Sequence, residues 1–149
     1  MAYRLTSATG AQNEDRHHPV RAYRTINWAE IDPADSFRSI DFDDFYFSFK
    51  NPIGERRDLL CNGLNLKEMF EKLNNHQCFC IGETGFGTGL TFALALQIFL
   101  NHAPSSARLQ WITVEAMPMS LEALGRAHKR LNLTGELLKI INQLQAECP

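Results

Sequence analysis

The spacing of apolar positions changes near residue 77, and this change divides the chain into two parts. After residue 77 a short apolar run, CFCIG, leads into a glycine-rich turn, and a longer apolar run follows over residues 88–102. A second short run, LQWITVE, comes next. Short apolar runs bounded by turn residues are typical of strands, and a longer run is typical of a helix. The pattern therefore predicts a strand–helix–strand unit whose strands are parallel and buried.

Two more helices are predicted after this unit. Residues 120–131 form the first, and residues 135–146 form the second, in which Leu137, Ile141 and Leu144 recur at helical spacing. The fold class that this order of elements predicts is α/β.

The part before residue 77 has a different rhythm. Its apolar runs, TINWAEI, DFYFSF and RRDLLCNG, are short and alternating or aromatic, and the turn-like sequences NPIG and NGLN interrupt and close them. This pattern predicts a small antiparallel β section over residues 25–76. Residues 1–24 hold four arginines and no sustained apolar period, so we expect a loose N-terminal extension. We expect residues 25–149 to form one domain portion, with the β section first and residues 77–149 after it.

Composition narrows the class of protein. With 149 residues and 44% hydrophobic residues the chain is long and apolar enough for one globular core. The net charge of -2 gives no overall basic field, so any nucleic-acid contact has to be local. The opening sequence lacks an apolar leader, and the longest apolar run is about half of a membrane span. We expect a cytoplasmic protein that makes no membrane contact.

The cysteines and histidines of this sequence do not indicate a metal-binding or catalytic site. Cys78 and Cys80 alternate on one strand and are expected to be small core residues, and no metal site is expected. Histidines 76, 102 and 128 are interpreted as isolated surface or helix-end residues.

The glycine turn is the strongest chemical signal. Gly85, Gly87 and Gly89 lie between the first predicted strand and its helix, where backbone N–H groups can meet a polar ligand group. A phosphate-binding P-loop would need a lysine after its last glycine, and a dinucleotide turn would need a small residue at Leu90. Glu83, two residues before the first glycine, would repel a pyrophosphate and suit an ammonium group. These features favour a nucleotide that carries an amino acid.

The sequence E83-T-G85-F-G87-T-G89 resembles the cofactor turn of class I S-adenosylmethionine (SAM) dependent methyltransferases. The resemblance implies a Rossmann-like fold. In that fold, an acid at the end of the second strand accepts hydrogen bonds from the ribose hydroxyls of the cofactor. Glu115 occupies that position. The cofactor-binding residues that the resemblance implies are Glu83, Gly85, Phe86, Gly87, Thr88, Gly89, Glu115 and Ala116.

A closer resemblance extends over about residues 25–144. Residues 43–48, 61–64, 85–92 and 114–119 are similar to the DDxYFS, GNxL, GFGTGLNF and FEKxPL segments of the methyltransferase half of the MnmC family, in the same order. Thr91 stands where the family usually has asparagine, and CNGLNL is a loose fit. The resemblance implies an N-terminal portion of that methyltransferase domain, with an incomplete Rossmann-like fold.

The implied reaction is SAM-dependent methylation of tRNA. The amine of 5-aminomethyl-(2-thio)uridine at the wobble position would become 5-methylaminomethyl-(2-thio)uridine. The family's catalytic aspartate is expected beyond residue 149, and Asp44 and Tyr46 are substrate-side candidates. FAD would belong only to a separate C-terminal oxidase domain of bifunctional relatives. Two alternatives stay open, an NAD- or FAD-dependent oxidoreductase and a non-catalytic, truncated binding module.

Overall fold

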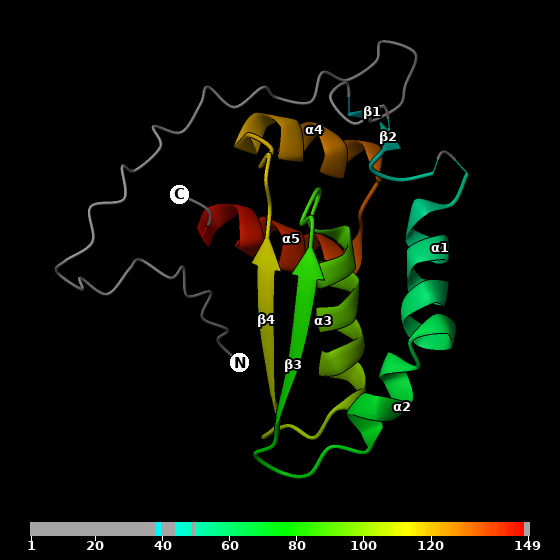
Figure 1. The fold of residues 1–149 in the computed structure, drawn as a ribbon, viewed down its shortest axis with the longest axis vertical. Coiled ribbons are helices and arrows are strands. Elements are labelled where there is room, and N and C mark those ends of the chain that lie inside the picture. Colours follow the sequence, from blue (N-terminus) through cyan, green and yellow to red (C-terminus); the bar gives the residue numbers. More distant parts are fainter. Residues whose placement is uncertain (1–37, 40–43, 49, 148–149) are drawn as a thin grey trace, which may run out of the picture.

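The computed structural model describes residues 38–39, 44–48 and 50–147 (Figure 1). The predicted extension and the run TINWAEI lie outside these residues. The described elements are β1 (Arg38–Ser39), β2 (Asp44–Phe45), α1 (Pro52–Asp58), a π-helical turn (Leu59–Gly63), α2 (Leu66–Glu71), β3 (Cys78–Thr84), α3 (Leu90–His102), β4 (Arg108–Val114), α4 (Leu121–Arg130) and α5 (Gly135–Glu147).

The predicted strand–helix–strand unit is confirmed. Strands β3 and β4 pair in parallel, with a register that runs from Cys78 opposite Arg108 to Thr84 opposite Val114. Helix α3 connects them, so the unit is the βαβ arrangement from which Rossmann-like folds are built. The helix begins two residues later than predicted because Gly89, its N-cap, has a left-handed φ of 72°.

The two following helices are also confirmed. Helix α4 begins after Ser120, whose side chain accepts a hydrogen bond from the backbone N–H of Ala123 at 3.0 Å. This is the arrangement expected of a serine N-cap. Helix α5 begins at the predicted residue and ends one residue later than predicted.

The predicted antiparallel β section is wrong, because residues 52–63 and 66–71 are helical. The sequence NPIG is a helix start and not a turn. The Asn51 side chain accepts the Gly54 N–H at 3.1 Å, and Pro52 occupies the first helical turn, where its missing N–H costs nothing. Of the β section, the described residues contain one antiparallel pair of two-residue strands, β1 with β2.

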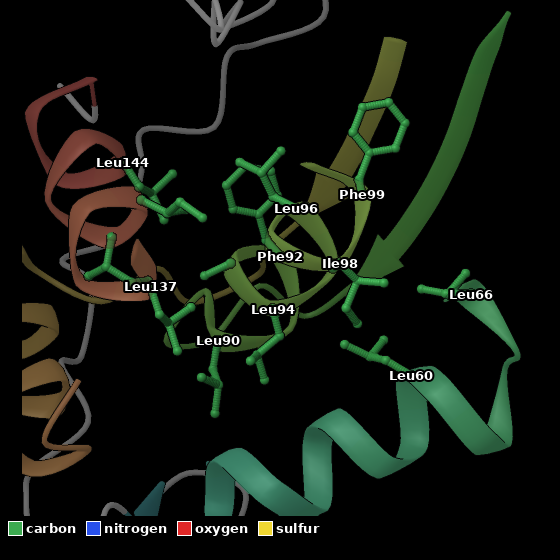
Figure 2. Packing of buried hydrophobic residues seen from close by; sticks show 14 of the residues in the cluster. Leu60, Leu66, Leu90, Phe92, Leu94, Leu96, Ile98, Phe99, Leu137 and Leu144 are labelled. Atoms are coloured by element: carbon green, nitrogen blue, oxygen red, sulfur yellow. The ribbon is translucent and has the colours of Figure 1, made fainter. Parts of the chain in front are cut away.

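Helix α3 forms the centre of the hydrophobic core. It is apolar on nearly all sides, as expected for a helix surrounded by other elements. Figure 2 shows Leu137 and Leu144 of α5 on one side of α3 and Leu60 and Leu66 on the other. Phe70 of α2 is fully buried, and its ring makes edge-on contacts with the rings of Phe79 and Phe99.

The two faces of the β3–β4 sheet differ in burial. Phe79, Ile81 and Trp111 are partly buried and pack against the core that contains α3. On the opposite face, Ile112 and Val114 are 53% and 63% exposed. The prediction of buried strands is therefore wrong for this face. The prediction of Cys78 and Cys80 as core residues is wrong for the same reason, because both are exposed there.

None of the helices in the described ranges has the length and apolar character that a bilayer crossing requires. Those ranges also contain no group of three or more histidine, cysteine, aspartate or glutamate side chains placed to bind a metal ion.

Candidate functional site

A cavity of about 580 Å³ lies at the carboxyl ends of β3 and β4. Its volume falls in the range of about 300–1,000 Å³ that is common for small-molecule sites. This edge of a parallel sheet is also where ligands bind in open α/β folds. The cavity is lined by Ser39, Asp44, Phe45, Tyr46, Thr84, Gly85, Gly87, Val114, Glu115 and Ala116.

The glycine turn forms one wall of this cavity. Gly85, Gly87 and Gly89 all have positive φ, at 79°, 54° and 72°, a conformation that favours glycine. A Cβ atom on Gly87 would lie 3.2 Å from the Tyr46 ring, whereas a Cβ atom on Gly85 would meet nothing within 4 Å. Gly87 therefore allows close approach of Tyr46, and Gly85 leaves its backbone open to the cavity.

Glu115 joins the second strand to the glycine turn. One carboxylate oxygen accepts the Gly87 N–H at 2.9 Å, and the other accepts the Met117 N–H at 2.9 Å. Each carboxylate oxygen has two lone pairs, so Glu115 can still accept further hydrogen bonds from a ligand. The structure thus brings together two groups that the sequence separates by almost thirty residues.

Glu83 lies apart from the cavity lining. Its carboxylate accepts the indole N–H of Trp111 at 3.1 Å. Burial raises the pKa of Glu83, while hydrogen bonds from Trp111, Thr113 and Thr91 and the charge of Arg56 act in the opposite direction. The predicted action of Glu83 on a ligand ammonium stays a prediction, and action through the backbone fits this position better than direct contact.

Three other predicted residues, Phe86, Thr88 and Gly89, belong to the turn but do not line the cavity. Thr88 is buried, and Phe86 is partly buried against the core. A Cβ atom on Gly89 would lie 2.9 Å from side-chain atoms of both Phe86 and Leu144. These residues do not line the cavity, so their contribution is to the conformation of the turn.

Curated relatives of the chain share one name, the tRNA 5-methylaminomethyl-2-thiouridine biosynthesis bifunctional protein MnmC. The protein from Pseudomonas entomophila is 42% identical over 104 residues, covering 68% of this chain and 16% of the relative. The protein from Pseudomonas savastanoi pv. phaseolicola is 39% identical over 125 residues, covering 84% and 18%. The Acinetobacter baylyi protein is 38% identical over 125 residues, covering 83% and 20%. Over the matched residues the chain is MnmC-like.

The match to MnmC concerns one part of these proteins. The chain spans about a sixth to a fifth of the length of the three relatives. No protein-family model matches the chain. The resemblance to MnmC that the segments of the sequence indicate is confirmed.

The MnmC-like segment that contains Asp44 and Tyr46 lies on the cavity wall together with the glycine turn and Glu115. Sequence reasoning missed the neighbouring Ser39 and Phe45, which also line the cavity. His128 lies in the last turn of α4, in agreement with the helix-end interpretation, but it is buried and contacts Thr88, so it is neither isolated nor on the surface. The spacing of His128 from Leu124 and Leu131, four residues before and three after, would have placed it on the inner face of α4.

Proposed function

We propose that this chain forms the SAM-binding part of a tRNA methyltransferase. The main support for the proposal is the hydrogen bond from the Gly87 N–H to the Glu115 carboxylate, because both residues line a cavity of ligand size. The names of the MnmC relatives support tRNA as the substrate class. The proposed reaction methylates the amine of 5-aminomethyl-(2-thio)uridine at the wobble position.

The residues of the cavity fit an adenosyl ligand that carries an amino acid. Each carboxylate oxygen of Glu115 accepts one backbone N–H and has a further lone pair. Glu115 can therefore also accept hydrogen bonds from the two ribose hydroxyls. Gly85 has open space where a side chain would be, so a ligand can approach its backbone. Gly87 and Ala116 complete this side of the wall.

Methyl transfer to an amine depends mainly on orientation. When bound, SAM supplies a methyl group on a positively charged sulfur. The complete enzyme has to hold the acceptor amine in line with that group and to provide a carboxylate that takes up the amine proton. Asp44 and Tyr46 face the same cavity as Glu115 and are the substrate-side candidates among the described residues.

An oxidoreductase function is the weaker alternative. A dinucleotide turn needs a small residue at position 90, and Leu90 is buried there as part of the core. The βαβ unit and the acid after β4 are shared by both classes, so ligand binding has to separate them.

The first test measures the melting temperature of the purified chain with SAM, S-adenosylhomocysteine, NAD or FAD. A ligand that binds only the native state raises the melting temperature. We expect a shift with the two S-adenosyl compounds and its loss in Glu115→Gln. The matched control is Glu122→Gln, because Glu122 is exposed on α4 and pairs with Arg126. A shift with NAD or FAD alone would overturn the proposal.

The second test addresses the reaction. Transfer of labelled methyl groups from SAM to tRNA bearing 5-aminomethyl-2-thiouridine is measured with the chain and with Glu115→Gln. Methylation that depends on Glu115 would support the proposed substrate. Binding of S-adenosyl compounds without methylation would restrict the role of this chain to cofactor binding.

A further inference from the structure

His128 makes a long-range contact with the glycine turn. Its side chain is 5% exposed, and its Nε2 atom lies 2.8 Å from the backbone carbonyl oxygen of Thr88, forty residues earlier in the chain. A carbonyl oxygen only accepts hydrogen bonds, so Nε2 carries the hydrogen and donates it. Buried polar groups are normally paired in this way, and here the partner is the turn itself.

The contacted residue has a glycine on each side. Thr88 lies between Gly87 and Gly89, which both have positive φ. The Thr88 carbonyl and the Gly89 N–H belong to one planar peptide group, so fixing the carbonyl also orients that N–H. The Gly89 N–H donates to the Phe86 carbonyl at 2.9 Å, which closes the turn. Glycine has the widest backbone freedom, so a turn with three glycines needs outside anchors to keep one conformation.

Two anchors come from the same stretch of chain. Glu115, directly after β4, accepts the Gly87 N–H, and His128 in α4 donates to the Thr88 carbonyl. The adjacent residues Gly87 and Thr88 are therefore held by a carboxylate and an imidazole that are 13 positions apart. Helix α4 lies above the end of β3 in Figure 1.

We propose that His128 is a positioning residue for ligand binding in this cavity. It holds the glycine turn in the conformation that presents the Gly85 and Gly87 backbone to the ligand. The choice of ligand for the test rests on the proposed function, while the anchoring of the turn does not.

The experiment compares the wild-type chain with His128→Leu, which removes the donor, and His128→Gln, whose amide nitrogen can replace Nε2. The control is His102→Leu, because His102 is partly exposed at the end of α3 and contacts Glu71. The dissociation constant of S-adenosylhomocysteine is measured by calorimetry on the folded protein, and the urea unfolding curve is recorded for each variant. We expect His128→Leu to weaken binding about tenfold, the effect of losing roughly one hydrogen bond, and His128→Gln to restore most of it.

A purely structural role would lower the unfolding midpoint and leave the dissociation constant of the folded protein within twofold of the wild type. That outcome in His128→Leu would overturn the proposal. If His128→Leu fails to fold, His128→Asn is used in the same comparison, because its shorter side chain keeps a polar group and does not reach the carbonyl.

Amide hydrogen exchange at Gly87 and Gly89 separates this proposal from the proposed function. If the wild type does not bind S-adenosylhomocysteine, the proposed function fails, and exchange still reports the anchoring. We expect faster exchange at both glycines in His128→Leu and near wild-type rates in His128→Gln. Unchanged rates in His128→Leu would overturn the role of His128.

Discussion

The two faces of the β3–β4 sheet carry similar side chains in different surroundings. Ile81 and Trp111 pack against the core of α3, while Ile112 and Val114 on the other face are more than half exposed. Apolar residues on both faces are typical of parallel strands, which are usually covered on both sides. We therefore expect the contribution of an apolar strand residue to stability to depend on the layer packed over it more than on its type.

The largest expected effect is on the covered side. Phe70 is fully buried and contacts the rings of Phe79 and Phe99. Phe70→Ala should lower the free energy of unfolding by about 3–5 kcal/mol, because it removes a ring and leaves a cavity. Urea unfolding measures this, with the 43% exposed neighbour Met69→Ala as control. Equal effects of the two changes would contradict the assignment of this core.

A matched pair tests the two faces directly. Ile81 is opposite Trp111, and Ile112 is one position further along the ladder, opposite Gly82. Ile81→Thr should lower the free energy of unfolding by about 1–3 kcal/mol, because it places a hydroxyl against the core. Urea unfolding of both threonine variants gives the comparison. Similar losses in both would show that the two faces are equally covered in solution.

The covered face also contains a carboxylate, Glu83. Burial raises its pKa in the folded state above the unfolded value, so the folded protein binds this proton more tightly. The contribution of Glu83 to stability is then fully present below about pH 4.5 and is lost as the pH rises through the folded pKa. Glu83→Gln removes this dependence. We expect the variant to gain stability relative to the wild type as the pH rises through that window, measured by urea unfolding at several pH values.

The smallest effect is expected on the exposed face. Ile112→Thr should change the free energy of unfolding by no more than about 0.5 kcal/mol, as is usual for surface substitutions. Thermal unfolding and solubility can be measured on the same sample. A loss above about 1 kcal/mol would mean that Ile112 is buried in solution, against its exposure in the structure.

Local signals were enough to predict the second part of the fold. The change of period near residue 77 and the glycine cluster predicted the βαβ unit, and Ser120 marked the start of α4. The meeting of Glu115 with the glycine turn also followed from sequence, because the carboxyl ends of neighbouring parallel strands share one edge of the sheet.

Two kinds of feature could not be predicted from local sequence: an element start whose residues suit two structures, and contacts between residues far apart in the chain. Asn51 and Pro52 suit a turn as well as a helix start, and in the structure the helix is accompanied by the Asn51 cap and by the packing of Ile53 against the core. The approach of Tyr46 to Gly87 and the contact of His128 with Thr88 join residues forty or more positions apart. No local pattern encodes such distances, so these parts of the site emerge only from the packing of the whole domain.

The exposed cysteines of β3 can be used to measure the solvent access of one face of the sheet. Cys78 and Cys80 point to the same face of one strand, because side chains two residues apart share a face. Cys78 is at the start of β3, at the opposite end of the strand from Thr84 and the cavity. In a variant with Cys61 and Cys148 replaced by serine, a thiol-reactive probe can therefore measure the solvent access of this face by its alkylation rate, in the presence or absence of any binding partner, and neither labelled cysteine lines the cavity.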